Sequence, residues 1–174
     1  RRKFLTDLKS ALDSKDDKTE LKLDFVYGSK ENDRLNPLDG QQRLTTLWLL
    51  HWYIAYKAGK LRKEKEELSK ESRSLKKFTY ETRVSSREFC EHLSEFSTEK
   101  PSAFEKTISD FIQQQTWFYS AWKQDPTIQS MLRMLSGTPN KDKDGQEIID
   151  GLEELFSDCT REDYEKYWTR LSGD

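Results

Sequence analysis

One long helix with an unusual start organises this chain, and it begins in the run Pro37-Leu38-Asp39-Gly40-Gln41-Gln42-Arg43-Leu44-Thr45-Thr46-Leu47. Large apolar residues follow the glycine so densely that they predict a helix from about Gly40 to Ala58, buried on most sides. Gly59 supplies a stop signal. The residues before this helix therefore sit at the positive end of the dipole of a firmly anchored element.

Shorter elements are expected ahead of this helix. Apolar residues at helical spacing predict an amphipathic helix over 2–13. Residues 21–27 alternate between apolar and polar and then turn apolar, which predicts a strand that is half buried at its start. Residues 29–36 are expected to form a charged loop, and residues 35–38 a short second strand. The motif thus follows a small α/β piece.

Residues 60–77 are strongly charged, with a net charge by count of about +4. Two interpretations stay open for them: a solvated helix or loop, and a surface that faces phosphates. Phe78–Thr82 has strand propensity. Ser85 or Ser86 is expected to cap the helix that follows.

The remaining residues are expected to be mainly helical, with helices over about 102–124, from Pro126, over 146–157 and over 161–171, and a loop over 137–144. The sequence therefore predicts an α+β, predominantly helical fold. We expect three parts: 1–59 with the motif, a charged connector over 60–77, and a helical region over 78–174.

Composition limits the class of protein. The 174 residues include 12% aromatic residues, five of them Trp, which is enough to build a core. The net charge is −2, so any basic binding surface must be local. Cys90 and Cys159 lie in no metal-binding or redox pattern, and a reduced cytoplasmic protein is the simpler interpretation, with a disulfide left open. We see no membrane-spanning run and no signal-peptide pattern in the sequence, and we expect no membrane partner.

The start of the central helix has the chemistry of an anion site. Free backbone N–H groups and the helix dipole favour a phosphate there. Gly40 has no side chain where a phosphate would approach, and Arg43 offers a planar fork that matches phosphate oxygens. Gln41 and Gln42 add neutral donors and acceptors. Asp39 can cap the helix, hold Mg²⁺ or orient water.

Two simpler interpretations stay beside this one. Asp39 can be a plain helix cap and Arg43 a surface charge, since Asp-Gly before a helix is common. The chain can then be a helical interaction module that binds no anion.

The run Asp39–Leu47 resembles the signature of the domain of unknown function 262 family. This is the N-terminal domain of GmrSD-type modification-dependent restriction enzymes and related phage-defence proteins of bacteria. Further stretches resemble the same family, and together they cover most of residues 1–135: Phe25–Ser29, Phe78–Arg83, Ser85–Phe89, Trp117–Tyr119 and Trp122–Thr127.

The resemblance implies a fold, an activity and a set of site residues. The fold would be a truncated ParB/sulfiredoxin-like α/β piece followed by a helical bundle. The activity would be binding, and hydrolysis, of a nucleoside triphosphate with Mg²⁺ to drive or regulate cleavage of foreign, modified DNA. The implied roles are catalytic for Asp39, Gln42 and Arg43, phosphate-binding for Gly40, Gln41, Gln42 and Arg43, and metal-binding for Asp39. Thr45 and Arg83 are second-rank phosphate-binding candidates.

The chain departs from the family pattern in two ways. Family domains usually begin with an extended segment that contains a Gln-Arg pair and an aromatic residue, and we expect this chain to start after it. Family enzymes often carry an HNH-type nuclease domain, whereas His51 and His92 lie in no such pattern. We therefore expect a nuclease domain in cis or in trans as a partner, beside nucleotide and DNA, and leave a second copy of the chain open. A DNA-sensing or protein-interaction module without turnover is the rival function.

The sequence gives weaker evidence for several other candidate sites. The run 140–145 opens like a calcium loop, but Gly151 stands at the twelfth position, where a bidentate Glu is needed. Arg83 and Arg87 can form a phosphate clamp or structural ion pairs. Four aromatic residues can stack on nucleic-acid bases or belong to the core, and their helical spacing favours the core: Trp117, Phe118, Tyr119 and Trp122. His51 is expected to be packed, and His92 to lie on a helix surface.

Overall fold

The computed structural model describes residues 2–14, 26–61, 63–64, 67–96, 107–141, 145 and 147–172. Its elements are, in chain order, α1 (Arg2–Asp13), β1 (Gly28–Glu31), β2 (Arg34–Pro37), α2 (Gln41–Lys57), β3 (Lys63–Glu64), β4 (Glu67–Leu68), α3 (Lys70–Leu75), α4 (Val84–Ser94), α5 (Ile108–Gln113), the 3₁₀ helix η1 (Ser120–Gln124), α6 (Pro126–Ser136), β5 (Pro139–Lys141), β6 (Glu147–Ile149), α7 (Leu152–Leu155) and α8 (Arg161–Ser172). The predicted α+β, predominantly helical class is confirmed.

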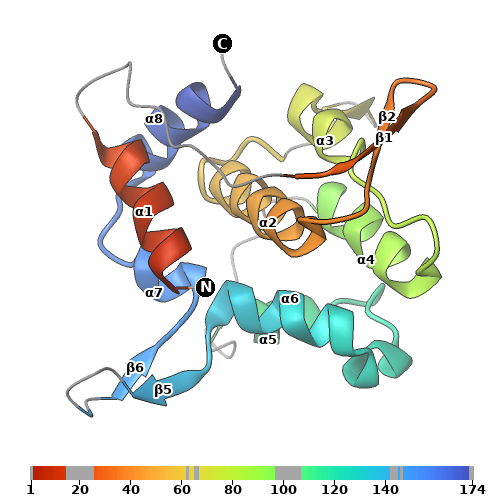
Figure 1. The fold of residues 1–174 in the computed structure, drawn as a ribbon. Coiled ribbons are helices and arrows are strands. Elements are labelled where there is room, and N and C mark those ends of the chain that lie inside the picture. Colours follow the sequence, from red (N-terminus) through yellow and green to blue (C-terminus); the bar gives the residue numbers. More distant parts are fainter. Residues whose placement is uncertain are drawn as a thin grey trace.

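Helix α2 is the centre of the molecule, and the other helices surround it (Figure 1). It packs against α8, α6 and α3. Ten of its residues are buried, and Trp52 and Ile54 are fully enclosed. The core is thus shared between the segment before residue 59 and the segment after residue 78, while the predicted domain boundaries stay a prediction. Among the described residues, no helix has the length and apolar character needed to cross a bilayer.

The terminal helices α1 and α8 close one side of the core. Leu5, Leu8 and Leu12 form the buried face of α1, as the helical spacing predicts. The Arg170 side chain donates from Nη1 to the carbonyl oxygens of Ala11 (3.1 Å) and Leu12 (2.9 Å), which satisfies acceptors at the end of α1. The predicted helices over 2–13 and 161–171 are confirmed.

The strands pair only as antiparallel hairpins in the described part of the chain: β1 with β2, β3 with β4 and β5 with β6. The predicted loop over 29–36 is wrong, because β1 and β2 pair from Gly28↔Pro37 to Glu31↔Arg34. Their turn residues, Asn32 and Asp33, have φ of 48° and 60°. Asn and Asp tolerate this left-handed region better than other residues with a side chain, so the hairpin forms without a glycine.

Other predicted elements change as well. Phe78–Thr82 forms no strand. The expected helix over 102–124 falls partly outside the described residues, and within them it is interrupted between α5 and η1. Residues 137–144 and 146–157 contribute the β5–β6 hairpin and the short α7 in place of a loop and a helix. The strand expected over 21–27 lies mostly outside the described residues.

The starts of α6 and α4 show which residues cap these helices. Asp125 caps α6: its Oδ1 accepts from the amides of Thr127 (2.9 Å) and Ile128 (3.1 Å), and Pro126 occupies the first turn. The expected cap at Ser85 or Ser86 is wrong, because α4 begins at Val84 and Arg83 precedes it.

Glu153 joins three elements through one carboxylate. Its two oxygens accept from the amide of Ile108 at the start of α5 (3.1 and 3.0 Å), and Oε2 also accepts from Ser136 Oγ (2.6 Å) at the end of α6. We expect Glu153→Gln to lower the free energy of unfolding by about 1–3 kcal/mol, because charge-assisted bonds are lost. Urea unfolding measures this. A loss equal to that of Glu162→Gln, on the exposed start of α8, would contradict it.

Candidate functional site

The motif lies at a sharp corner between strand β2 and helix α2. The amides of Leu38 (2.7 Å) and Asp39 (3.0 Å) both donate to the carbonyl oxygen of Tyr27, which precedes β1. The hairpin therefore ends in a fixed position immediately before Gly40. Gly40 has a φ of 83° and turns the chain into α2. A residue with a side chain would be strained in this conformation.

Gly40, and not Asp39, is the residue that caps the helix. The Asp39 Oδ1 accepts from the adjacent Gly40 amide (2.7 Å), and the Asp39 side chain is exposed. The expectation that Asp39 could cap α2 is therefore wrong. Its carboxylate instead lies beside the corner, where the α2 dipole favours negative charge.

The first turn of α2 presents donors to this corner. The earliest helical hydrogen bond runs from the Leu44 amide to the Gly40 carbonyl oxygen (3.1 Å). The amides of Gln41, Gln42 and Arg43 precede it, and Gly40 has no side chain with which to cap them. The arrangement can accept an anion, as the sequence predicts for this position.

The two glutamines of the motif have different surroundings. Gln41 Nε2 donates to the Pro37 carbonyl oxygen (2.9 Å), so this side chain braces the corner between β2 and α2. The Gln42 side chain is exposed, and its backbone carbonyl oxygen accepts from Thr46 Oγ1 (2.8 Å). Arg43 is half-buried in the same turn. Of the candidate side chains, Gln42 is thus accessible to a ligand and Gln41 is held by the backbone.

Thr45 leads to a residue that we did not single out from the sequence. Thr45 is buried, and its Oγ1 donates to the Gln41 carbonyl oxygen (3.0 Å) and lies 2.7 Å from the hydroxyl of Tyr80. Tyr80 belongs to the Phe78–Arg83 segment, which resembles the family and from which only Arg83 was chosen. Arg83 stands out in the sequence because its positive charge suits a phosphate. A contact between two hydroxyl groups 35 positions apart leaves no pattern in a single sequence.

Arg83 is oriented toward a different helix start. Its Nη1 donates to the Thr127 hydroxyl in the first turn of α6. Burial raises the pKa of Tyr80, and the positive charge of Arg83 acts in the opposite direction. These contacts make Arg83 a structural link, and its phosphate-binding role stays a prediction.

The charged segment is partly anchored. Ser72 and Leu75 of α3 are buried, and the Trp48 ring nitrogen donates to the Leu75 carbonyl oxygen (3.0 Å). Lys76 forms an ion pair with Glu95 (2.6 Å). The described part of this segment therefore includes a helix that packs on α2 and still exposes charged side chains.

The histidines and most aromatic residues belong to the packing. His51 Nδ1 lies 2.7 Å from the Leu47 carbonyl oxygen. His92, expected on a helix surface, is half-buried there and stacks on Trp117, with ring centroids 5.1 Å apart. Phe118 and Trp122 are buried as expected, whereas Tyr119 is 54% exposed.

Outside the motif, the described residues give little support to metal binding or to thiol chemistry. Within the residues described, no three His, Cys, Asp or Glu side chains gather in a group that could hold a metal ion. Cys90 and Cys159 are free thiols. Burial raises the pKa of Cys90, which suppresses the nucleophilic thiolate at neutral pH.

Together, fold and site define a predominantly helical α+β domain whose central helix starts with an Asp-Gly-Gln-Gln-Arg corner. Residues 1–148 match the family model of the GmrSD restriction endonuclease, N-terminal domain. The chain belongs to this family, as the resemblance predicts. No curated protein and no solved structure matches it.

Proposed function

We propose that this domain binds a nucleoside triphosphate with Mg²⁺ at the corner formed by Asp39–Arg43, and that hydrolysis of the nucleotide drives or regulates cleavage of foreign, modified DNA. The observation that supports this most is the left-handed Gly40 directly ahead of the first turn of a buried helix. A phosphate can approach closely there and meet the amides of Gln41–Arg43.

The side chains of the corner have distinct roles in this proposal. Arg43 stabilises the negative charge that develops on the phosphoryl oxygens. The exposed Gln42 orients the attacking water, and Gln41 keeps the corner in shape through Pro37. Water attacks the terminal phosphorus, the bond to the bridging oxygen breaks, and the nucleoside diphosphate and inorganic phosphate leave. The proton of the water passes to solvent.

The residues fit a magnesium ion that arrives with the nucleotide. Mg²⁺ is commonly held by one or two carboxylates together with substrate phosphates and water. Asp39 supplies an exposed carboxylate at the corner, fixed by the Gly40 amide (2.7 Å). When bound, Mg²⁺ neutralises charge on the phosphate oxygens. Asp39 contributes the ligand and its orientation.

DNA cleavage is assigned to a nuclease domain in cis or in trans. Family membership supports DNA as the target, and we propose that the protein acts in the cytoplasm of a bacterial cell. Both histidines are engaged in packing contacts, and the described residues hold no metal-binding cluster. An HNH-type partner would supply the metal-dependent cut, and the domain described here would control it.

The alternative is a DNA-sensing or protein-interaction module without turnover. The exposure of large apolar side chains around the β1–β2 hairpin favours it: Tyr27 is 69% exposed, Leu35 54% and Leu38 72%. Apolar groups exposed together often mark a contact surface. In this alternative the motif corner is a structural joint below an interaction surface.

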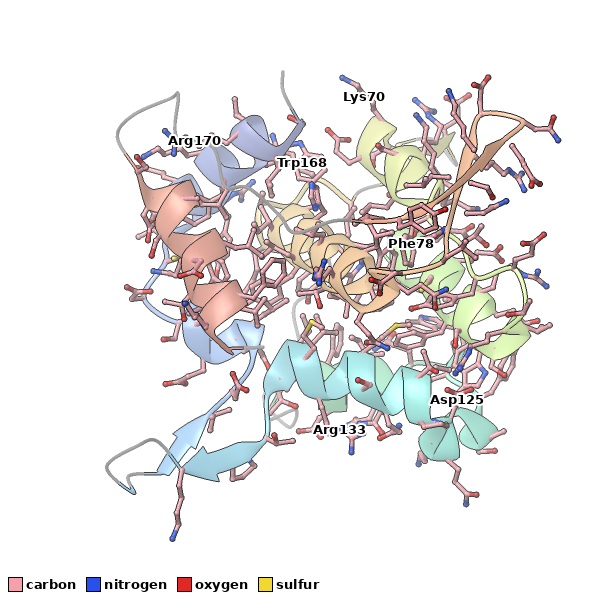
Figure 2. All side chains as sticks on the ribbon, viewed as in Figure 1. Lys70, Phe78, Asp125, Arg133, Trp168 and Arg170 are labelled. Carbon is pink, nitrogen blue, oxygen red and sulfur yellow. The ribbon has the colours of Figure 1, made fainter. Side chains whose placement is uncertain are left out.

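Calorimetric titration with each of the four ribonucleoside triphosphates and Mg²⁺ tests the proposal. We expect saturable binding of at least one of them, weakened about 10- to 100-fold in Arg43→Ala, because a charge-assisted contact is removed. The control is Arg133→Ala, which removes an exposed arginine on the outer face of α6 (Figure 2). Binding of none of the four would reject nucleotide binding by this chain and favour the interaction module.

A further inference from the structure

The first turns of α2 are covered on one side by the segment Leu75–Tyr80. The Trp48 ring nitrogen donates to the Leu75 carbonyl oxygen (3.0 Å), and the Trp48 ring stacks on Phe78 with centroids 5.3 Å apart. Phe78 lies beside α2 near the base of the hairpin (Figure 2). Phe78 in turn meets the Tyr80 ring edge to face at 5.5 Å. Aromatic contacts therefore hold the Tyr80 ring against the helix that carries the motif.

The Thr45 hydroxyl has only one proton, and this decides which residue donates in its hydrogen bond with Tyr80. A carbonyl oxygen can only accept, so the single Thr45 hydroxyl proton goes to the Gln41 carbonyl oxygen (3.0 Å). The Tyr80 hydroxyl, 2.7 Å from Thr45 Oγ1, must then be the donor in its bond with Thr45. The chain of bonds runs from Tyr80 through Thr45 to Gln41, the first residue of α2.

Gln41 passes this constraint to the corner. Its backbone carbonyl receives the Thr45 hydroxyl, and its side chain donates to Pro37 at the end of β2 (2.9 Å). The adjacent amides are those assigned to phosphate. Thr45 is buried and Tyr80 is half-buried, so water replaces the bond between their hydroxyls only in part when the Tyr80 hydroxyl is removed.

We propose that Tyr80 is a positioning residue of the nucleotide site, which fixes the first turn of α2 through Thr45 so that the amides after Gly40 converge on a phosphate. The inference rests on the proposed function and assigns a residue outside the motif to it. Arg83, three residues after Tyr80, donates to Thr127, so residues 75–83 connect the motif helix with α6. Tyr80 does not touch the nucleotide in this proposal.

The test compares Tyr80→Phe with Tyr164→Phe. Each variant removes a tyrosine hydroxyl and keeps the ring; the Tyr164 hydroxyl donates to the Phe156 carbonyl oxygen (2.9 Å) in the core and also bonds with Tyr53, away from the motif. We expect Tyr80→Phe to weaken nucleotide binding about five- to tenfold, and Tyr164→Phe to leave it unchanged while lowering stability. In a double-mutant cycle, Tyr80→Phe should add nothing to Thr45→Val, since both break the same chain of bonds.

Amide hydrogen exchange of the motif segment separates this inference from the proposed function. We expect faster exchange in the first turns of α2 in Tyr80→Phe and not in Tyr164→Phe. If Tyr80→Phe binds nucleotide within twofold of the unmodified protein, the inference is wrong. If the unmodified protein binds none, the proposed function fails, and exchange alone decides whether Tyr80 positions the corner: equal exchange in both variants overturns it.

Discussion

Trp52→Ala lowers the free energy of unfolding by about 3–5 kcal/mol, the range for removal of a large buried aromatic side chain. Trp52 is fully buried in α2, its ring nitrogen donates to the Leu93 carbonyl oxygen of α4 (2.7 Å), and its ring stacks on Tyr56 at 5.3 Å. Alanine leaves a cavity between α2 and α4 and removes the bond. Urea unfolding followed by circular dichroism measures the change.

Two further variants serve as controls for Trp52→Ala. Trp52→Phe keeps an aromatic ring in the cavity and should cost clearly less than Trp52→Ala. Tyr119→Ala removes an aromatic residue that is 54% exposed and should change stability by roughly 1 kcal/mol or less. A loss in Trp52→Ala no greater than that of Tyr119→Ala would mean that α2 is not the centre of the core.

If the domain hydrolyses nucleotide as proposed, we expect Asp39→Asn to reduce the rate about 100-fold or more and to leave the fold intact. The asparagine side-chain oxygen can still accept the Gly40 amide (2.7 Å), so the corner keeps its geometry. The asparagine side chain lacks the negative charge that would attract Mg²⁺. The metal would then be poorly placed against the phosphates. Phosphate release under saturating nucleotide measures the rate, and calorimetry measures nucleotide affinity without Mg²⁺, which should change little.

The matched control is Asp33→Asn in the turn between β1 and β2. Asp33 is exposed and has a φ of 60°, a conformation that asparagine adopts readily. Asp33→Asn makes the same charge change in the neighbouring hairpin without touching the corner, and should hydrolyse nucleotide at the unmodified rate. Full turnover by Asp39→Asn would remove the metal-binding role assigned to Asp39.

The elements predicted correctly are those with strong local signals. Helix α2 follows from dense apolar residues between Gly40 and Gly59, and α6 from the start at Pro126 and the apolar residues after it. The strand expected over residues 35–38 is found as β2, whereas β1 and its pairing with β2 were missed because these strands are largely polar and their turn lacks glycine. Strand pairing there depends on backbone hydrogen bonds, which leave no hydrophobic pattern in the sequence.

The site was predictable to the extent that it is local. The run Asp39–Arg43 predicts the helix start by itself, because a glycine directly before a dense apolar run can adopt the left-handed turn that leads into the helix. Tyr80 and the contact of Arg83 with Thr127 depend on how α3, α4 and α6 pack around α2, and residues 35 or more positions apart must meet. Tertiary contacts of this kind require the structure.

The most direct test of the central claim is a nuclear magnetic resonance titration of the ¹⁵N-labelled protein with the nucleotide that binds in calorimetry, in the presence of Mg²⁺. If the corner holds the phosphates, the amide resonances of Gly40, Gln41, Gln42 and Arg43 shift most, and in Arg43→Ala the shifts of Gly40, Gln41 and Gln42 require about 10- to 100-fold more nucleotide. Saturating nucleotide that shifts resonances elsewhere and leaves those four amides unchanged would contradict the account.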